Sequence, residues 1–338
     1  MYTNRIVTYY RDEMVLAKDS EENFSKSPMK PKLMMEYLKA ENLHDHFEII
    51  NEWEGFTDKE FLRAHTEKYV NAFFAGEKEC ELVGMEWSEQ FADSVRFTNA
   101  SLYNSIRHSI LNRTSICFSP TSGFHHARPS GGSSYCTFSG QVIVSLKIYE
   151  DFGLSGCYVD LDGHYGNSIE DSRKFCPQLA QASPKGFNIN PAGARQMYLD
   201  DLKLELKKLE EAILAEEIGY VVFCHGADSH KDDELGYQLT TEEWLECSRM
   251  VYGMIKQVSE KRGKTVPLSL CMFGGYRSDD YNSVLSLHTA DMMIGLNILA
   301  GESIEYEPKL KERKIETNFP GLEQGIAAYT RRKDTEQY

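Results

Sequence analysis

The chain has 338 residues, of which 41% are hydrophobic, and a formal net charge of −15 from 37 basic and 52 acidic residues. This acidity argues against a nucleic-acid partner, whose phosphates it would repel, and suits cationic small molecules or lysine-rich peptides. The length allows one large α/β domain or two small ones. No apolar run approaches the roughly 20 residues of a membrane span, so no membrane partner is expected.

The cellular compartment is predicted from the cysteines and the N-terminus. None of the eight cysteines forms a C-x-x-C pair, and several lie in apolar, strand-like runs, as is typical of reduced core thiols. Residues 1–14 contain four charged side chains and lack the apolar stretch of a signal peptide. We therefore expect a cytoplasmic protein. No pattern in the sequence indicates an oligomeric state.

Strand and helix patterns alternate along the chain. Apolar or alternating runs predict strands at 5–10, 47–52, 114–119, 157–161, 220–224 and 267–273. Helical periodicity predicts helices at 28–39, 93–111, 138–149 and 197–217. Capping boxes at Thr57/Glu60 and Thr240/Glu243 predict two more, the first running to about residue 64 or beyond and the second stopping near Gly263.

This alternation predicts a three-layer α/β/α fold with a mostly parallel sheet and helices on both faces. Because no repeat, linker or sharp break in composition interrupts the chain, we expect a single domain over residues 1–338. Its charged C-terminal tail, 302–338, is expected to wrap the surface or to be partly mobile.

The most informative stretch is C-Y-V-D-L-D-G-H-Y-G-N at 157–167. In an extended chain Asp160, Asp162 and His164 would point to the same side, at the carboxyl end of a buried strand where α/β sheets place ligands. A divalent metal would satisfy all three groups, because buried acids need a cation or hydrogen bonds. The alternative is that the acids cap a helix or pair with an arginine, and this motif alone makes the two interpretations about equally good.

Three other predicted strands also end in polar residues. His125 and His126 follow the strand at 114–119, Asp228 follows 220–224, and Tyr276 follows 267–273. In a parallel sheet all of these side chains would converge on one edge. Each signal is weak singly, since a histidine pair or a Gly-Gly-Tyr turn is more often structural. Their coincidence favours a functional site.

Five motifs occur in a fixed order: G-F-H-H-A at 123–127, S-Y-C-T-F at 134–138, V-D-L-D-G-H-Y-G-N at 159–167, G-A-D-S-H-K-D-D-E-L-G at 226–236 and G-G-Y at 274–276. Together they resemble the signature of zinc-dependent histone deacetylases and their bacterial relatives, the acetylpolyamine amidohydrolases and acetoin-utilisation-type proteins. The resemblance extends over about residues 5–299. It implies an arginase/deacetylase-like fold and a metal-dependent amidohydrolase that acts on an acetylated amine.

The resemblance also implies a ligand set. Asp162, His164 and Asp228 would hold one metal ion, Zn²⁺ or alternatively Fe²⁺, because two carboxylates and one imidazole suit both. A structural monovalent cation is a further expectation from the family. The substrate would be an acetylated lysine side chain in a peptide, a polyamine or another small acetylated amine.

The catalytic roles are likewise implied by the resemblance. His126 would be the general base, oriented by Asn167, and would later protonate the leaving amine. His125 would stand beside it, oriented by Asp160. Tyr276 would donate a hydrogen bond to the developing oxyanion.

The sequence departs from the family pattern near the expected substrate tunnel. Ser134 stands where a glycine usually precedes Tyr135, which would form one tunnel wall. Tyr165 replaces a second histidine, and Phe273 shortens the glycine run before the tyrosine. Residues 176–192 do not reproduce the other wall, so the second wall stays unassigned.

Two rival functions remain open. A non-catalytic acyl-lysine binder could keep the same fold, although every polar group needed for catalysis is present. An arginase-type ureohydrolase with two metal ions would need additional Asp or His ligands, whereas the chain has one D-x-D-x-H motif.

Overall fold

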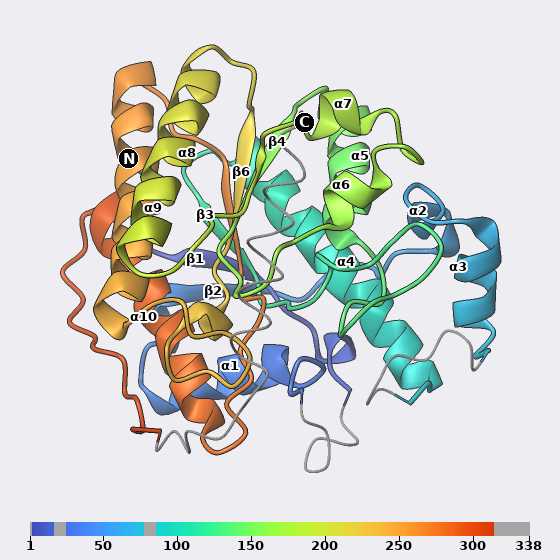
Figure 1. The fold of residues 1–338 in the computed structure, drawn as a ribbon, viewed down its shortest axis with the longest axis horizontal. Coiled ribbons are helices and arrows are strands. Elements are labelled where there is room, and N and C mark those ends of the chain that lie inside the picture. The colour runs from blue at the N-terminus through green and yellow to red at the C-terminus, as the bar shows by residue number, and fades with distance from the viewer. Residues whose placement is uncertain (1, 17–24, 78–85, 314–338) are drawn as a thin grey trace.

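The computed structural model describes residues 2–16, 25–77 and 86–313. Its seven strands form one sheet in the order β2-β1-β3-β7-β6-β4-β5, and every pair of neighbours is parallel (Figure 1). The strands are β1 (Ile6–Tyr9), β2 (Phe47–Ile50), β3 (Ile116–Ser119), β4 (Gly156–Asp160), β5 (Asn188–Ile189), β6 (Tyr220–Cys224) and β7 (Leu268–Cys271).

Helices cover both faces of this sheet, so the predicted three-layer α/β/α class is confirmed (Figure 1). The helices are α1 (Lys30–Ala40), α2 (Asp58–Phe61), α3 (Glu67–Phe74), α4 (Glu89–Leu111), α5 (Gly140–Phe152), α6 (Ser168–Ser172), α7 (Leu179–Ala182), α8 (Gln196–Leu214), α9 (Thr241–Arg262) and α10 (Tyr281–Ala300). Helices α1, α8, α9 and α10 pack on one face, and α3, α4 and α5 pack on the other.

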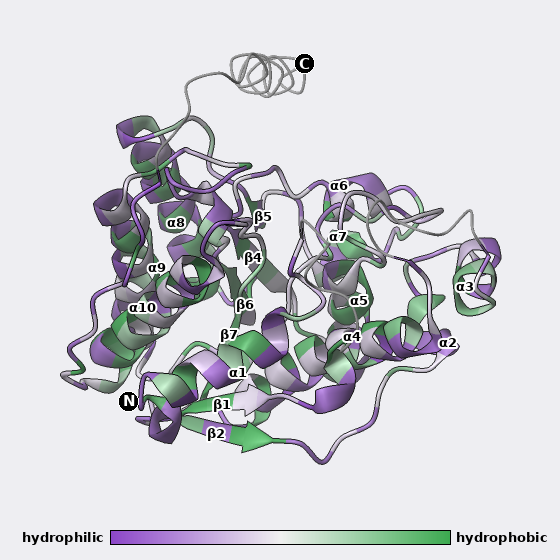
Figure 2. Cartoon of the chain, turned by 90° about the horizontal axis from the view of Figure 1, so that it is seen from below, coloured by the Kyte–Doolittle hydropathy of each residue, from purple (hydrophilic) through white to green (hydrophobic). Residues whose placement is uncertain are grey.

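The inner strands β1, β3, β7, β6 and β4 are mostly apolar because both of their faces lie under helical layers, whereas the edge strand β2 leaves Glu48 and Ile49 exposed. Successive residues alternate between the two layers, so that Ile6 and Val221 belong to one apolar cluster and Val7 and Val222 belong to the other. Figure 2 shows β4, β6 and β7 in green at the centre of the molecule. The middle of the sheet is therefore buried on both sides, and access to its polar groups is limited to its edges and ends.

The strand ends that matter for function are level with one another. Ser119 of β3 pairs with Cys271 of β7, Cys271 with Cys224 of β6, and Cys224 with Asp160 of β4. The loops that follow these four strands consequently leave the sheet side by side.

The helix predicted from Thr57 is shorter than expected. Its capping box with Glu60 forms, but α2 ends at Phe61. A new helix, α3, then begins after its own cap, in which the Thr66 side chain accepts a hydrogen bond from the Tyr69 backbone N–H. The second capping box, at Thr240 and Glu243, opens α9 as predicted, and that helix ends at Gly263.

Helix α10 was not among the predicted elements. Within the described residues it is the one helix long and apolar enough to cross a membrane by length and composition, and 78% of its apolar window is buried inside this structure. This burial is that of a core helix covered by α1 and α9.

The C-terminal segment was expected to wrap the surface or to be partly mobile. Residues 301–313 lie along α10, where Asn297 and Ile304 exchange two hydrogen bonds and Tyr306 bonds to Ser286. The rest of the predicted tail, 314–338, lies outside the described residues.

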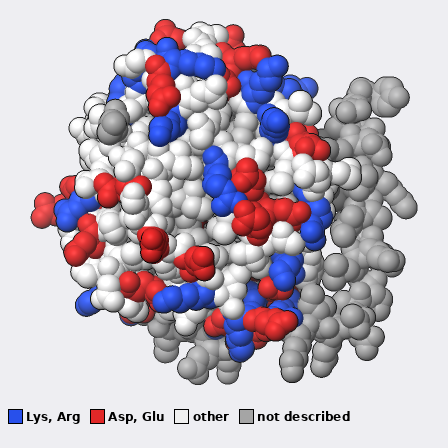
Figure 3. Space-filling view, turned by 90° about the vertical axis from the view of Figure 1, so that its left-hand side faces the viewer, with Lys and Arg blue, Asp and Glu red and all other residues white. Residues whose placement is uncertain are grey.

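On the side of the molecule that lies to the left in Figure 1, acidic and basic side chains are interspersed (Figure 3).

Candidate active site

The polar residues that follow β4 and β6 meet at the carboxyl end of the sheet. One ligand atom from each of Asp162, His164 and Asp228 lies within 4.8 Å of the others, which makes this group able to hold a metal ion. His164 Nδ1 is 3.2 Å from Asp162 Oδ1 and 3.0 Å from Asp228 Oδ2. Among the described residues, no other group of His, Cys, Asp or Glu meets this criterion.

Backbone N–H groups hold both carboxylates of this cluster. Gly163 donates to Asp228 Oδ1 at 2.9 Å, and Gly274, just after β7, donates to Asp162 Oδ2 at 2.8 Å. A Cβ atom at Gly274 would lie 2.3 Å from Asp228 Oδ2, and one at Gly236 would lie 1.4 Å from the Asp228 carbonyl oxygen. Glycine is therefore required at these two positions, since Gly274 lies against the Asp228 carboxylate and Gly236 lies against the Asp228 backbone.

The three groups of this cluster strongly shift one another's protonation. Burial and the neighbouring Asp162 raise the pKa of Asp228 to about 7. Burial opposes the charge on Asp162, but His125 and His164 outweigh it and hold the Asp162 pKa well below its usual range. Burial likewise opposes protonation of His164, yet hydrogen bonds to both carboxylates raise its pKa to about 11. Two buried carboxylates and an imidazole that share protons in this way are a suitable set of ligands for a divalent cation.

Asp160 does not join this cluster, although strand alternation predicted that it would. Strand β4 ends at Asp160, so Asp162 and His164 lie in the loop beyond it and the alternation no longer applies. The Asp160 Oδ2 atom instead lies 3.0 Å from His125 Nδ1. Asp160 is thus a partner of His125 and not a member of the candidate metal-binding group.

The two adjacent histidines have different partners. His125 Nδ1 faces the Asp160 carboxylate, whereas His126 Nδ1 lies 2.8 Å from Asn167 Oδ1. The Asn167 amide nitrogen donates to Asp171 at 2.6 Å, which directs its oxygen toward His126. His126 therefore carries its proton on Nδ1, and Nε2 is the nitrogen that can accept one.

Their protonation states differ as well. Burial disfavours the charged form of His125, but the Asp162 and Asp160 carboxylates outweigh burial and raise its pKa to about 9. Burial, and then the charge on His125, lower the pKa of His126 to about 3. The rings lie 4.1 Å apart between centroids, so only one of them is charged at neutral pH.

Tyr276 lies against the metal cluster from the β7 side. Its ring centroid is 6.3 Å from that of His164 and 5.6 Å from that of Tyr135. Burial, followed by the Asp162 and Asp228 charges, raises the Tyr276 pKa well above its usual range, so its hydroxyl keeps its proton. The turn before it includes Phe273 at φ +57° and Gly275 at φ +148°.

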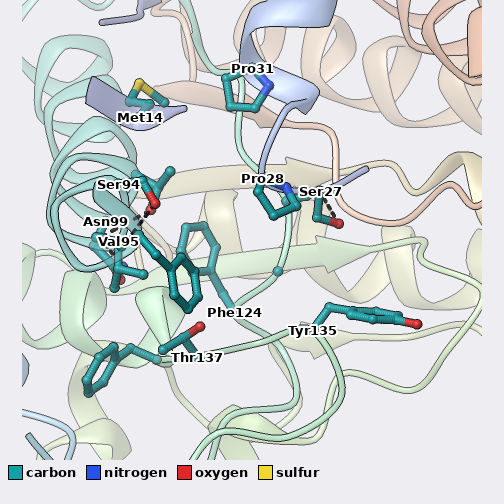
Figure 4. Close-up of a pocket in the computed structure, with 15 residues that line it drawn as sticks. Met14, Ser27, Pro28, Pro31, Ser94, Val95, Asn99, Phe124, Tyr135 and Thr137 are labelled. Carbon is teal, nitrogen blue, oxygen red and sulfur yellow. Dashed lines mark hydrogen bonds between the residues drawn. The ribbon is translucent and has the colours of Figure 1, made fainter. Parts of the chain in front are cut away.

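Tyr135 borders an open pocket with an empty volume of about 520 Å³. The pocket lies between the start of α1, helix α4 and the loop after β3, with Phe124 in its middle (Figure 4). None of its lining residues is charged. Ser134, which precedes Tyr135, has φ +51°, so a serine occupies the left-handed conformation that favours glycine.

Two buried side chains beside Tyr276, Lys30 and Asp233, were not predicted from the sequence. The ammonium of Lys30 is fully buried and donates to the backbone carbonyls of Phe273 and Gly274, the latter at 2.9 Å. Burial lowers the Lys30 pKa to about 7. Asp233 accepts a hydrogen bond from the Tyr276 backbone N–H at 2.7 Å. The motif at 226–236 includes Asp233 and could have drawn attention to it, whereas Lys30 appeared only as one position of a predicted helix.

Comparison with known proteins gives three findings. A family profile described as "Histone deacetylase domain" matches residues 25–183, a little under half of the chain. Histone deacetylase 8 of Xenopus laevis is 32% identical over 79 residues, which are 23% of this chain and 24% of that protein. Histone deacetylase 8 of Xenopus tropicalis is 32% identical over 76 residues, which are 22% and 20% of the two chains. The matched part thus spans a quarter or less of these curated relatives.

A solved structure extends the likeness to nearly the whole chain. The one titled "Crystal Structure of HDA15 HD domain" has a TM-score of 0.64 and 15% sequence identity, and the match covers 90% of this chain and 91% of that chain. This likeness shows that the α/β fold is of the arginase/deacetylase type. Asp228 and Tyr276 lie beyond the residues of the family match, so their place in the site depends on the fold and the geometry.

Proposed function

We propose that this chain belongs to the histone deacetylase superfamily and is a metal-dependent deacetylase that hydrolyses the acetyl amide of an acetylated lysine side chain, polyamine or related small amine. The observation that supports this proposal most is that three kinds of functional group meet at the carboxyl edge of the sheet. The Asp162–His164–Asp228 cluster, a neutral histidine and a protonated tyrosine lie side by side there.

Asp162, His164 and Asp228 would hold the metal ion, which we propose to be Zn²⁺ or Fe²⁺. When bound, such an ion supplies Lewis acidity to the acetyl carbonyl and lowers the pKa of a water ligand. A structural monovalent cation remains part of the proposal because of the family resemblance alone.

The proton chemistry is assigned to His126. Its low pKa keeps it neutral at physiological pH, and Asn167 holds the proton on Nδ1, which leaves Nε2 to take a proton from water. The same nitrogen can then return that proton to the departing amine. His125 is fixed by Asp160 and lies beside His126 as a positive neighbour.

Tyr276 is assigned to the acyl oxygen. Since its pKa is well above the usual range, the phenol keeps its proton at neutral pH and can donate a hydrogen bond. A donor of this kind stabilises the negative charge that develops on the carbonyl oxygen. Tyr135, whose ring faces Tyr276, would form a wall for the alkyl chain of the substrate.

Two rival functions gain no specific support. The described residues contain one candidate metal group, whereas a ureohydrolase site would need two adjacent ones. A binder without turnover would not need a neutral histidine and a protonated tyrosine on either side of a metal cluster. We also propose that the substrate is met in the cytoplasm, without nucleic acid or membrane.

A substrate panel tests the proposal. The purified protein, loaded with Zn²⁺ or Fe²⁺, is incubated with an acetyl-lysine peptide, acetylputrescine and acetylspermidine, and acetate release is measured. Turnover of at least one compound is expected. Binding of an acetyl-lysine peptide without acetate release would favour the non-catalytic binder, and urea release from a guanidino substrate would favour the ureohydrolase.

A further inference from the structure

The segment that follows α10, residues 301–313, reaches the catalytic tyrosine from outside the sheet. We call this segment the C-terminal strap. From its geometry we infer that one residue of the strap serves the active site: Arg313, acting through Asp233, is a positioning residue for Tyr276. This inference rests on the proposed role of Tyr276, and its test includes a measurement that does not depend on activity.

The backbone of Tyr276 needs external support. It follows a turn in which Phe273, a bulky residue, has φ +57° and Gly275 has φ +148°. Left-handed conformations cost energy for a bulky side chain and persist only where surrounding contacts enforce them. The N–H of Tyr276 then bonds to the Asp233 carboxylate at 2.7 Å, and not to a neighbouring strand. The position of the phenol therefore depends on where Asp233 is held.

Asp233 is held from two directions. Its other carboxylate oxygen accepts the Leu235 N–H at 2.9 Å, which fixes the side chain within its own loop. Its backbone carbonyl accepts a hydrogen bond from Arg313 Nη1 at 3.0 Å. Asp233 is 1% exposed, so little room is left for water to replace either partner.

A second contact ties the strap to the other side of the tyrosine. Arg277, the residue after Tyr276, is 3% exposed and donates to the Lys311 carbonyl at 3.0 Å. It also forms a two-pronged ion pair with Asp279 at 2.8 and 2.9 Å. The strap thus bonds, through Lys311 and Arg313, to groups on either side of Tyr276.

The strap itself is anchored along its length. The Ser286 and Ser283 hydroxyls of α10 accept the backbone N–H groups of Lys309 and Lys311 at 2.6 and 3.0 Å. Tyr306 bonds to both Ser286 and Tyr37 of α1. Because these contacts lie on core helices, the strap carries the rigidity of the α1–α10 layer to the tyrosine loop.

The first test is amide hydrogen exchange of the segment 273–278 in the full chain. We expect Arg313→Ala to speed exchange of the Tyr276 amide, because the loop that carries Asp233 loses a tether. Lys309→Ala is the matched control, since it removes another strap cation whose side chain is 65% exposed and pairs with Glu41. Equal protection of the Tyr276 amide in wild type and Arg313→Ala would overturn the inference, whether or not the protein is a deacetylase.

Kinetics then separate positioning from general destabilisation. Arg313→Ala should lower kcat by about tenfold, as expected for a misplaced reacting group, with little change in KM and an unchanged metal content. Arg313→Lys should restore part of the rate, and Lys309→Ala should leave it unchanged.

The decisive comparison is made in a Tyr276→Phe background. There Arg313→Ala should have no further effect, because the two residues act as a unit. An equal fold loss in both backgrounds would overturn the role through Tyr276. If Tyr276→Phe itself has the wild-type rate, the proposed function of Tyr276 is wrong, and the exchange measurement alone decides whether the strap holds its backbone.

Discussion

The two sides of the candidate site are held in place by different means. On the ligand side, Asp162 and Asp228 accept hydrogen bonds from the backbone N–H groups of Gly274 and Gly163, which follow β7 and β4, the two strands that flank β6. On the tyrosine side, the Tyr276 N–H bonds to a side chain, Asp233, carried by a separate loop. The ligand side therefore shares the rigidity of the sheet, whereas the tyrosine side can be disturbed without loss of the metal ligands.

The largest expected effect comes from breaking the ligand side. Asp228→Ala removes one of three ligands and leaves Asp162 and His164 as an incomplete set, so bound metal and activity should be lost together. Metal analysis and an acetate-release assay on the purified variant check this. Asp45→Ala, which changes an exposed carboxylate before β2, is the matched control. A full equivalent of metal in Asp228→Ala would mean that the ligands are assigned wrongly.

Breaking the tyrosine side should lower the rate but leave the metal in place. Tyr276→Phe removes the donor to the oxyanion and should reduce kcat by about a hundredfold or more, with little change in KM. His126→Ala should be at least as severe, and neither variant should lose metal because neither residue is a ligand. Steady-state kinetics with parallel metal analysis test this. Wild-type rates in both variants would place the chemistry elsewhere.

A smaller effect is expected from a histidine that serves the fold rather than the site. His65 is 1% exposed, accepts the Ser139 N–H at 2.9 Å, and has a pKa that burial lowers to about 3. Below its ordinary pKa of about 6.5, the unfolded chain binds a proton that the folded chain does not. The contribution of the neutral His65 to the free energy of unfolding is therefore complete above about pH 6.5 and is lost as the pH falls toward about 3.

Urea unfolding at two pH values measures this contribution. Between pH 7 and pH 5 the wild type should lose about 2 kcal/mol more of its free energy of unfolding than His65→Gln does, because the glutamine does not titrate. The glutamine oxygen can still accept the Ser139 N–H, which makes the substitution conservative. Parallel pH profiles for the two proteins would show that His65 is not held neutral by the fold.

The smallest expected effect concerns charge near the substrate. The net charge of −15 could raise the local concentration of a cationic substrate over a long range. Ions at ~0.15 M screen exposed charges beyond about 8 Å. We expect kcat/KM for a cationic substrate to fall several-fold from low to high salt while a neutral analogue of equal length barely changes. Superimposable salt titrations would mean that the acidity serves solubility alone.

Much of the fold could be predicted because its signals are local. Strand β6 coincides with the predicted run 220–224, whose residues are apolar on both faces of the sheet. The cap of α9 is likewise contained in four residues, Thr240 to Glu243. Helix α10 escaped prediction since it is buried nearly all round and has no polar face to give a helical period.

In the candidate site, too, the residues in local motifs could be predicted, whereas contacts between distant segments could not. Asp162, His164 and Asp228 lie in short motifs just after apolar strands, so the parallel sheet brings them together. The turn of Asp160 toward His125 depends on where β4 ends, which a two-residue period does not reveal. Contacts such as that of Arg313 with Asp233, 80 residues away, or of Lys30 with Gly274 depend on tertiary packing and leave no pattern in the neighbouring sequence.

The central claim is that one metal ion, held by Asp162, His164 and Asp228, supports amide hydrolysis. Titration of the chelator-treated protein with Zn²⁺ or Fe²⁺, followed by acetate release from an acetylated substrate, tests it most directly. We expect the rate to rise from near zero and to reach its plateau at one ion per chain. A rate that does not depend on added metal, or a plateau at two ions per chain, would contradict it.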